Sequence, residues 1–154
     1  MFLSETFDDF IHNVVSLDDT RLNRIQRAHN AVRDDIEALD AVQEISTGPT
    51  FLQGSYAIYT PVRPCDGESS YDVDIVLPAD FWNEHGRLPD GHSVVRWLRD
   101  QIQENDQYTE KTEVKRHCVR INYEADEGRF HLDFVPAHTL DPAQGPVQVP
   151  PDWS

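Results

Sequence analysis

The segment Tyr71-Asp-Val-Asp-Ile-Val-Leu77 decides the fold, because its residues alternate between apolar and acidic. Successive side chains of a β-strand point to opposite sides, so the apolar residues share one face and the two aspartates share the other. The α-carbons of Asp72 and Asp74 would lie about 6.7 Å apart. Two carboxylates this close together are unfavourable unless a cation lies between them. The segment therefore predicts a strand whose polar face binds cations.

A second strand with the same alternation is predicted at residues 130–135. Its apolar face consists of Phe130, Leu132 and Phe134, which leaves the opposite face to His131, Asp133 and Val135. Asp133 thus supplies a third carboxylate. Magnesium prefers oxygen ligands, and a two-metal site holds its ions about 3.5 to 4 Å apart. We expect Asp72, Asp74 and Asp133 to bind two Mg²⁺ ions, or Mn²⁺ in their place.

The tetrapeptide Gln53-Gly-Ser-Tyr56 precedes the first of these strands and predicts a phosphate-binding turn. Gly54 lets the backbone approach a phosphate, and the Ser55 hydroxyl adds a donor, especially if a helix begins there. A Gly-Ser pair alone is usually only a turn, and an Asp-x-Asp pair alone is usually a solvated edge. The two in this order, with a third acid, are more specific than any part.

The remaining periodicity indicates one mixed α/β domain, in which a small sheet is flanked by helices. Helices are expected at 4–16, at 18–45 and from Asp90 or Ser93 to Asn105. Further strands are expected at 50–53, 119–123 and 147–149, with a hairpin turn at 125–128. The second helix would be roughly 40 Å long. The chain thus divides into N-terminal helices (1–48), a sheet region (49–140) and a proline-rich tail (141–154).

The composition limits the ligands and the location that can be expected. The chain has 154 residues, with 28 acidic and 13 basic side chains and a net charge of −15, so it offers no basic footprint for long nucleic acid. It contains only two cysteines, Cys65 and Cys118, without a zinc-type or disulfide-type spacing. No segment approaches the length needed to cross a membrane. We therefore expect a cytoplasmic protein.

Taken together, four motifs resemble those of the cGAS/DncV-like nucleotidyltransferases, or CD-NTases, of the polymerase-β-like superfamily. They are Gln53-Gly-Ser-Tyr, Thr60-Pro-Val-Arg-Pro64, Tyr71-Asp-Val-Asp-Ile-Val and Phe130-His-Leu-Asp-Phe-Val-Pro-Ala137. The resemblance covers most of the chain. It implies a polymerase-β-like core whose second helix is a long spine, with triphosphate held at Gln53, Gly54 and Ser55. It also implies magnesium at the three aspartates, with Asp133 near the attacking ribose hydroxyl.

The resemblance further implies a reaction and its biological setting. An enzyme of this family joins nucleoside triphosphates, releases pyrophosphate and makes a cyclic oligonucleotide that activates an effector protein in bacterial anti-phage defence. A regulatory protein partner is expected as well. Family members continue into a C-terminal helical lobe, so we expect this chain to be a fragment of a longer enzyme. A chain without this lobe can keep the metal ligands and still be inactive for lack of a closed cleft.

Two other functions remain open from the sequence. One is a nucleotidyltransferase of the same superfamily that modifies a protein, a tRNA or a small molecule. The other is a non-catalytic module that binds nucleotide or metal only. Histidines near the third acid allow a zinc or general-base role, although their spacing fits no established pattern; they are His117, His131 and His138. Arg63 can meet a phosphate, although solvation is the default for such charges. Three further basic residues can meet nucleotide or a partner, or simply be solvated: Lys115, Arg116 and Arg120.

Overall fold

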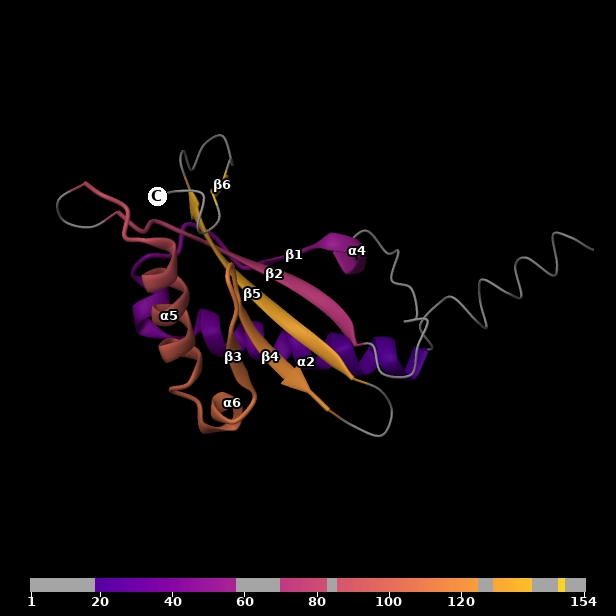
Figure 1. The fold of residues 1–154 in the computed structure, drawn as a ribbon. Helices are drawn as coiled ribbons and strands as arrows, with labels where there is room; N and C mark the ends of the chain where they lie inside the picture. The colour runs from indigo at the N-terminus through magenta and orange to yellow at the C-terminus, as the bar shows by residue number, and fades with distance from the viewer. Residues whose placement is uncertain (1–18, 58–69, 83–85, 125–128, 140–146, 149–154) are drawn as a thin grey trace, which may run out of the picture.

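A mixed β-sheet forms the centre of the molecule. The computed structural model describes residues 19–57, 70–82, 86–124, 129–139 and 147–148 (Figure 1). The strands of these residues lie in the order β1-β2-β5-β4-β3, and β6 pairs with β5. The strands are β1 (Phe51–Gln53), β2 (Tyr71–Ala79), β3 (Thr112–Val114), β4 (Val119–Tyr123), β5 (Phe130–Thr139) and β6 (Val147–Gln148).

The two strands that carry the aspartates are neighbours. β2 and β5 pair in parallel, whereas β1 is antiparallel to β2, and β4 is antiparallel to β5. A parallel pair needs a crossover connection, and here the chain passes through α5 (Gly91–Ile102) between the two strands. The expected mixed sheet with flanking helices is thus confirmed. The parallel pairing brings together segments that are far apart in the sequence.

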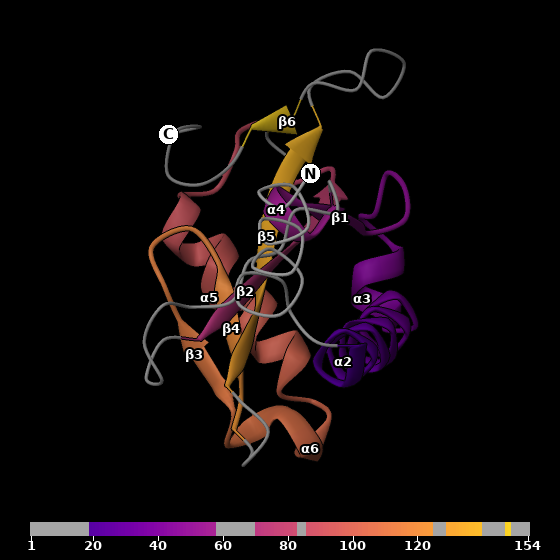
Figure 2. The same ribbon diagram turned by 90° about the vertical axis from the view of Figure 1, so that its right-hand side faces the viewer.

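The apolar faces of these strands form the core. Val73, Ile75 and Leu77 of β2 have no exposed surface, and neither have Leu132 and Phe134 of β5. They belong to one cluster with residues of α2 (Asp19–Glu37) and α5, so both helices pack on this face of the sheet. Figure 1 shows α2 behind the strands, and Figure 2 shows it beside the sheet. The face of the sheet away from these helices carries the polar side chains.

The spine helix is shorter than predicted. The prediction of one helix over 18–45 is wrong, because α2 ends at Glu37 and a separate turn, α3 (Asp40–Gln43), follows. Leu39 has an extended backbone conformation (φ −70°, ψ 127°), which interrupts the helix. The Glu37 side chain accepts hydrogen bonds from the backbone N–H and the hydroxyl of Thr50, so tertiary contacts favour this break. The 19 residues of α2 span about 28 Å.

Most other predicted elements are present, with shifted ends. β1, β2, β4 and β5 lie where strands were expected, although β2 and β5 are longer than predicted. Asp90 caps α5 by accepting from the Ser93 N–H (3.1 Å), and the helix ends at Ile102. Two short elements were not predicted, α6 (Asp106–Thr109) and β3. The predicted helix at 4–16, the turn at 125–128 and most of the tail at 141–154 lie outside the described residues.

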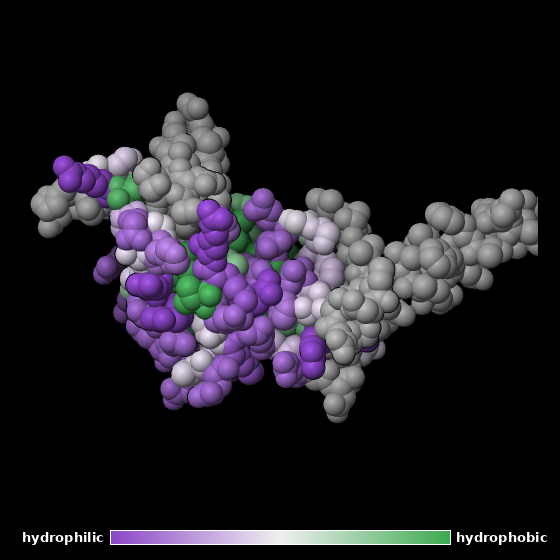
Figure 3. Space-filling view, viewed as in Figure 1, coloured by the Kyte–Doolittle hydropathy of each residue, from purple (hydrophilic) through white to green (hydrophobic). Residues whose placement is uncertain are grey.

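The surface seen in Figure 3 is mostly hydrophilic, and hydrophobic residues are confined to small patches on it. This agrees with the large net negative charge of the chain. Within the described part of the chain, no helix is both long enough and apolar enough to span a bilayer.

Candidate active site

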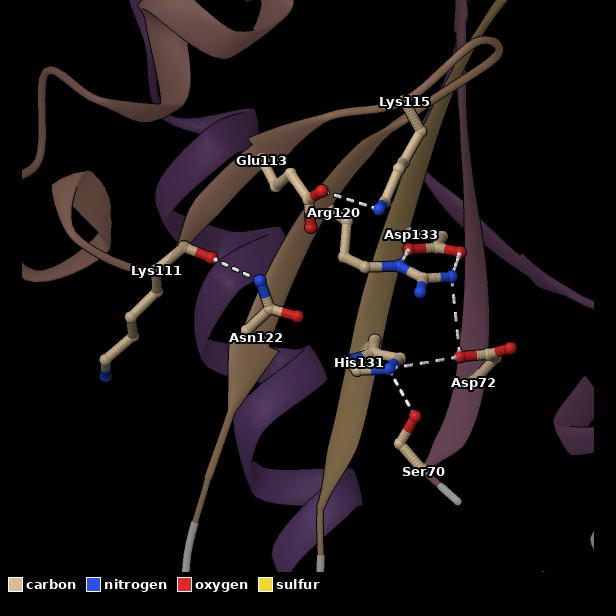
Figure 4. A network of polar contacts seen from close by, with 9 residues as sticks. All are labelled: Ser70, Asp72, Lys111, Glu113, Lys115, Arg120, Asn122, His131 and Asp133. Carbon is tan, nitrogen blue, oxygen red and sulfur yellow. Dashed lines mark hydrogen bonds and ion pairs between the residues drawn. The ribbon is translucent and has the colours of Figure 1, made fainter. Parts of the chain in front are cut away.

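The three predicted aspartates lie on one face of the sheet. In the parallel pairing of β2 and β5, Asp74 is directly opposite Asp133, and Asp72 is directly opposite His131. Directly paired residues of neighbouring strands point to the same side. The prediction that Asp133 shares a face with Asp72 and Asp74 is therefore confirmed. Figure 4 shows Asp72, His131 and Asp133 on the side of the sheet that faces away from α2.

The acids differ in exposure, and their negative charges crowd one another. Asp133 is buried (7% exposed), whereas the Asp72 side chain is 52% exposed. Burial raises the pKa of the Asp74 carboxyl above its ordinary value, and the charges of Asp133 and Asp72 raise this pKa further. The ionised form of Asp74 is thus penalised in this environment. A cation placed among the three carboxylates would relieve that penalty.

Arg120 of β4 lies among these acids. It is the cross-strand partner of Asp133, and its guanidinium donates from Nε to Oδ1 (2.8 Å) and from Nη2 to Oδ2 (2.7 Å) of that residue. The same Nη2 is 3.5 Å from Asp72 Oδ1. These hydrogen bonds to Asp133, with the nearby acidic charges, raise the pKa of the arginine. The sequence alone indicates a contact with nucleotide or a partner, or solvation, for this residue, and not its pairing with Asp133.

The carboxylates are of the donor type that magnesium prefers, although they are not arranged as a complete coordination site. Among the described residues, no group of three or more His, Cys, Asp or Glu side chains is placed to hold a metal ion. The donors are nevertheless oxygen ligands of the type that Mg²⁺ prefers, and Asp74 and Asp133 are directly paired. By donor type these residues fit the ion, and Asp72, Asp74 and Asp133 would hold it once their carboxylates turn toward one another. Metal binding itself stays a prediction.

The predicted phosphate turn lies against the acids. α4 (Gly54–Ala57) begins directly after β1, and Gln53 of β1 pairs with Asp74 of β2. Gly54 has φ +76°, and a Cβ atom at this position would lie 2.7 Å from Asp74 Oδ2. Only glycine allows both this backbone conformation and this approach. The turn is thereby held next to an acid, while phosphate binding by Gln53, Gly54 and Ser55 stays a prediction.

A group of aromatic side chains supports the Ser55 hydroxyl. The Oγ atom of Ser55 lies 3.0 Å from the hydroxyl of Tyr71, which is 7% exposed. Behind Tyr71, the ring of Tyr56 is 6.3 Å away, and His29 of α2 meets Tyr56 edge-on at 5.4 Å. Burial and the Arg33 charge lower the pKa of His29 to about 4, so it is neutral at pH 7. This group connects the spine helix to the turn.

The three histidines of the zinc hypothesis do not gather at one place. His131 Nε2 contacts the hydroxyl of Ser70 and is 3.8 Å from Asp72 Oδ1. Burial, with the charge of Arg120, lowers the pKa of His131. His138 is buried seven residues further along β5, where Nδ1 accepts from the Phe81 N–H (3.2 Å). Of the two histidines on β5, it is therefore His131 that borders the acids.

The chain matches known proteins along most of its length. Residues 1–151 match the family model described as "SMODS: Second Messenger Oligonucleotide or Dinucleotide Synthetase domain". A curated c-di-GMP synthase from Roseivirga ehrenbergii is 34% identical over 124 residues, which are 78% of this chain and 30% of that protein. The chain therefore belongs to the SMODS family, and the relationship to CD-NTases is confirmed.

Solved structures show the same fold. The Bradyrhizobium diazoefficiens CD-NTase CdnG in complex with GTP superposes with a TM-score of 0.64 at 21% identity, over 88% of this chain and 37% of CdnG. The E. coli MS115-1 CdnC:HORMA-deltaN complex matches with a TM-score of 0.65 at 15% identity, over 89% of this chain and 41% of that chain. Over the matched region, the chain thus has the fold of these CD-NTases. The chain spans less than half the length of each of these relatives.

Proposed function

We propose that this protein is a nucleotidyltransferase that joins nucleoside triphosphates into a cyclic oligonucleotide second messenger, with release of pyrophosphate. The observation that carries the proposal is the direct pairing of Asp74 with Asp133, beside a turn in which Gly54 has φ +76° and approaches the Asp74 carboxylate. Membership of the SMODS family supports the same conclusion.

The residues of this face divide the work in the proposed reaction. The backbone N–H groups of the Gly54–Ser55 turn and the Ser55 hydroxyl bind the triphosphate, together with Gln53, which directly precedes them at the end of β1. Asp133 orients the attacking ribose hydroxyl and accepts its proton. Asp72, Asp74 and Asp133 hold Mg²⁺, or Mn²⁺. The ions, when bound, supply activation of the attacking hydroxyl and stabilisation of the leaving oxygen.

The substrates and the product are proposed from the relatives. The Roseivirga relative bears the name c-di-GMP synthase, and CdnG was solved with GTP. We therefore propose nucleoside triphosphates as substrates and a cyclic di- or trinucleotide as product, acting on an effector in anti-phage defence. CdnC was solved with a HORMA protein, so a regulatory partner is part of the proposal. We place the reaction in the cytoplasm, where its substrates are made.

Product analysis tests the function. The protein is incubated with Mg²⁺ and the four NTPs, and the products are separated and identified by mass spectrometry. A cyclic dinucleotide or trinucleotide and pyrophosphate are expected. Asp72→Asn should lower the rate at least about 1000-fold, because a metal ligand supplies several kcal/mol of barrier reduction. Gly54→Ala should also lower the rate, because φ +76° is strained for alanine and the added Cβ would push the Asp74 carboxylate aside.

The matched control is Asp100→Asn, which removes an exposed carboxylate paired with Arg99 on α5 and should leave the rate unchanged. Full activity of Asp72→Asn would refute the proposal. Transfer of a nucleotide to an added protein, tRNA or small molecule, without cyclic product, would replace it with nucleotidyl transfer to that acceptor. Tight NTP binding without pyrophosphate release would indicate a non-catalytic module.

A further inference from the structure

Arg120 neutralises part of the charge that the acids create. Three carboxylates on neighbouring positions of β2 and β5 repel one another, and the guanidinium of Arg120 bonds both oxygens of Asp133 while lying 3.5 Å from Asp72 (Figure 4). A bidentate arginine–carboxylate ion pair is among the stronger polar interactions in proteins. The guanidinium thus contributes the positive charge that the group requires.

The position of Arg120 is fixed by the fold. Arg120 stands directly opposite Asp133 in the antiparallel pairing of β4 with β5. The two side chains are mostly shielded from water, with 22% of the arginine and 10% of the aspartate side chain exposed. Charges shielded in this way interact more strongly than charges at the surface. The ion pair is therefore a stable feature of this face.

Neighbouring cations are directed to other partners. The Nζ atom of Lys115 lies 2.6 Å from Glu113 Oε1, and Lys111 lies over the ring of Tyr123 at 5.1 Å from its centroid. Among the described residues, Arg120 forms ion pairs with both Asp133 and Asp72. His131 also lies 3.8 Å from Asp72. Arg120 is thus the strongest local competitor of an incoming cation.

We propose that Arg120 is an internal counter-cation that a divalent ion must displace from Asp133 when it binds to the acids. This inference rests on the proposed function, which assigns the three aspartates to divalent cations. The ion pair keeps the face stable while no metal is bound, and it lowers the affinity for a metal ion that arrives alone. Both oxygens of Asp133 are engaged by the guanidinium, so an ion that takes this carboxylate as a full ligand has to separate the pair.

Binding of Mn²⁺ to the metal-free protein tests the inference. Electron paramagnetic resonance follows the loss of the free Mn²⁺ signal, and thermal unfolding is recorded with and without Mn²⁺. Arg120→Gln should bind Mn²⁺ about tenfold more tightly than the wild type, which corresponds to about 1.4 kcal/mol. The same variant should have a lower midpoint of unfolding without Mn²⁺ and should regain most of the loss with it.

Two further variants separate the specific effect from general electrostatics. Lys115→Gln removes the same charge close by, from an exposed pair, and should change the affinity by less than about threefold. Arg120→Lys keeps the charge but loses the bidentate contact, so its affinity for Mn²⁺ should lie between those of the wild type and Arg120→Gln. It also serves if Arg120→Gln does not fold.

The possible results distinguish the inference from the proposed function. Equal or weaker Mn²⁺ binding by Arg120→Gln, or equal tightening by Lys115→Gln, would overturn the counter-cation role while leaving the metal site intact. Mn²⁺ binding that Asp72→Asn does not weaken in any of the backgrounds would instead overturn the metal site, and the inference with it.

Discussion

The two faces of the sheet use the same two strands for opposite purposes. On one face, side chains of β2 and β5 with no exposed surface pack against α2 and α5. The alternate residues of the same strands point to the other face, which carries the three acids. Arg120 of the neighbouring strand β4 lies opposite Asp133 on this face. The buried face gains free energy from removing apolar surface from water. The polar face destabilises the folded chain, because it concentrates like charges. It also carries the candidate catalytic residues.

The largest effect should separate the two faces. Phe134→Ala removes a fully buried ring from the apolar face of β5 and should lower the free energy of unfolding by about 3 to 5 kcal/mol. Asp72→Asn, on the polar face of β2 and half exposed, should change it by less than about 1 kcal/mol while removing the activity. Urea denaturation of both variants measures the difference. Equal losses of stability in the two variants would show that the apolar face is not more important for folding than the polar face.

A smaller effect should follow from the support of the phosphate turn. Tyr71→Phe removes the hydroxyl next to Ser55 Oγ, so the serine should be less well oriented and the KM for NTP should rise about three- to tenfold, with a smaller change in kcat. The control is Tyr108→Phe, which removes a hydroxyl that donates to Asp35 (2.6 Å) and lies away from the acids. That variant should lose stability without a change in KM. A KM that is unaltered in Tyr71→Phe would contradict the positioning role.

The smallest effect concerns the pH dependence of stability. The pKa of Asp74 is raised in the folded chain by burial and by the neighbouring acids, so its ionisation opposes folding. The stability associated with its protonated form is fully present below its ordinary pKa of 3.8 and is lost as the pH rises through the higher folded value. Asp74→Asn should therefore be slightly more stable than the wild type at pH 7, and the difference should shrink in acid.

Thermal unfolding between pH 3 and pH 8 without divalent ions measures this dependence. Asp100→Asn, whose carboxylate is exposed on α5, provides the reference for a removed charge. A stabilisation by Asp74→Asn that did not depend on pH would be inconsistent with a repelled carboxylate at this position.

The faces of the strands could be predicted from the sequence because alternation is a local property. Tyr71 to Leu77 shows which side each residue takes without reference to the rest of the chain. The same alternation in Val119-Arg-Ile121 places Arg120 on the face opposite the two apolar residues, so its presence on the polar face could be predicted. Its contact with Asp133 could not be predicted, because it depends on the register between β4 and β5.

The errors in the helices have similar causes. The end of α2 at Glu37 depends on contacts with Thr50 and on the backbone of Leu39, which helical periodicity does not report. His29 lies at the helical spacing of Ile25, Val32 and Ile36, so its position in the helix is consistent with burial. Hydrophobic periodicity does not indicate this, because histidine is polar. α6 and β3 are too short to show any periodicity.

The parallel pairing of β2 with β5 makes the candidate centre a product of complete folding. Asp74 and Asp133 become neighbours only after the intervening chain has crossed over through α5, so a nascent polypeptide that has emerged only as far as β4 carries no assembled centre. The same topology offers an engineering route. Cutting the chain between α5 and β4 would place Asp74 and Asp133 on separate fragments, so the proposed activity would require their reassociation.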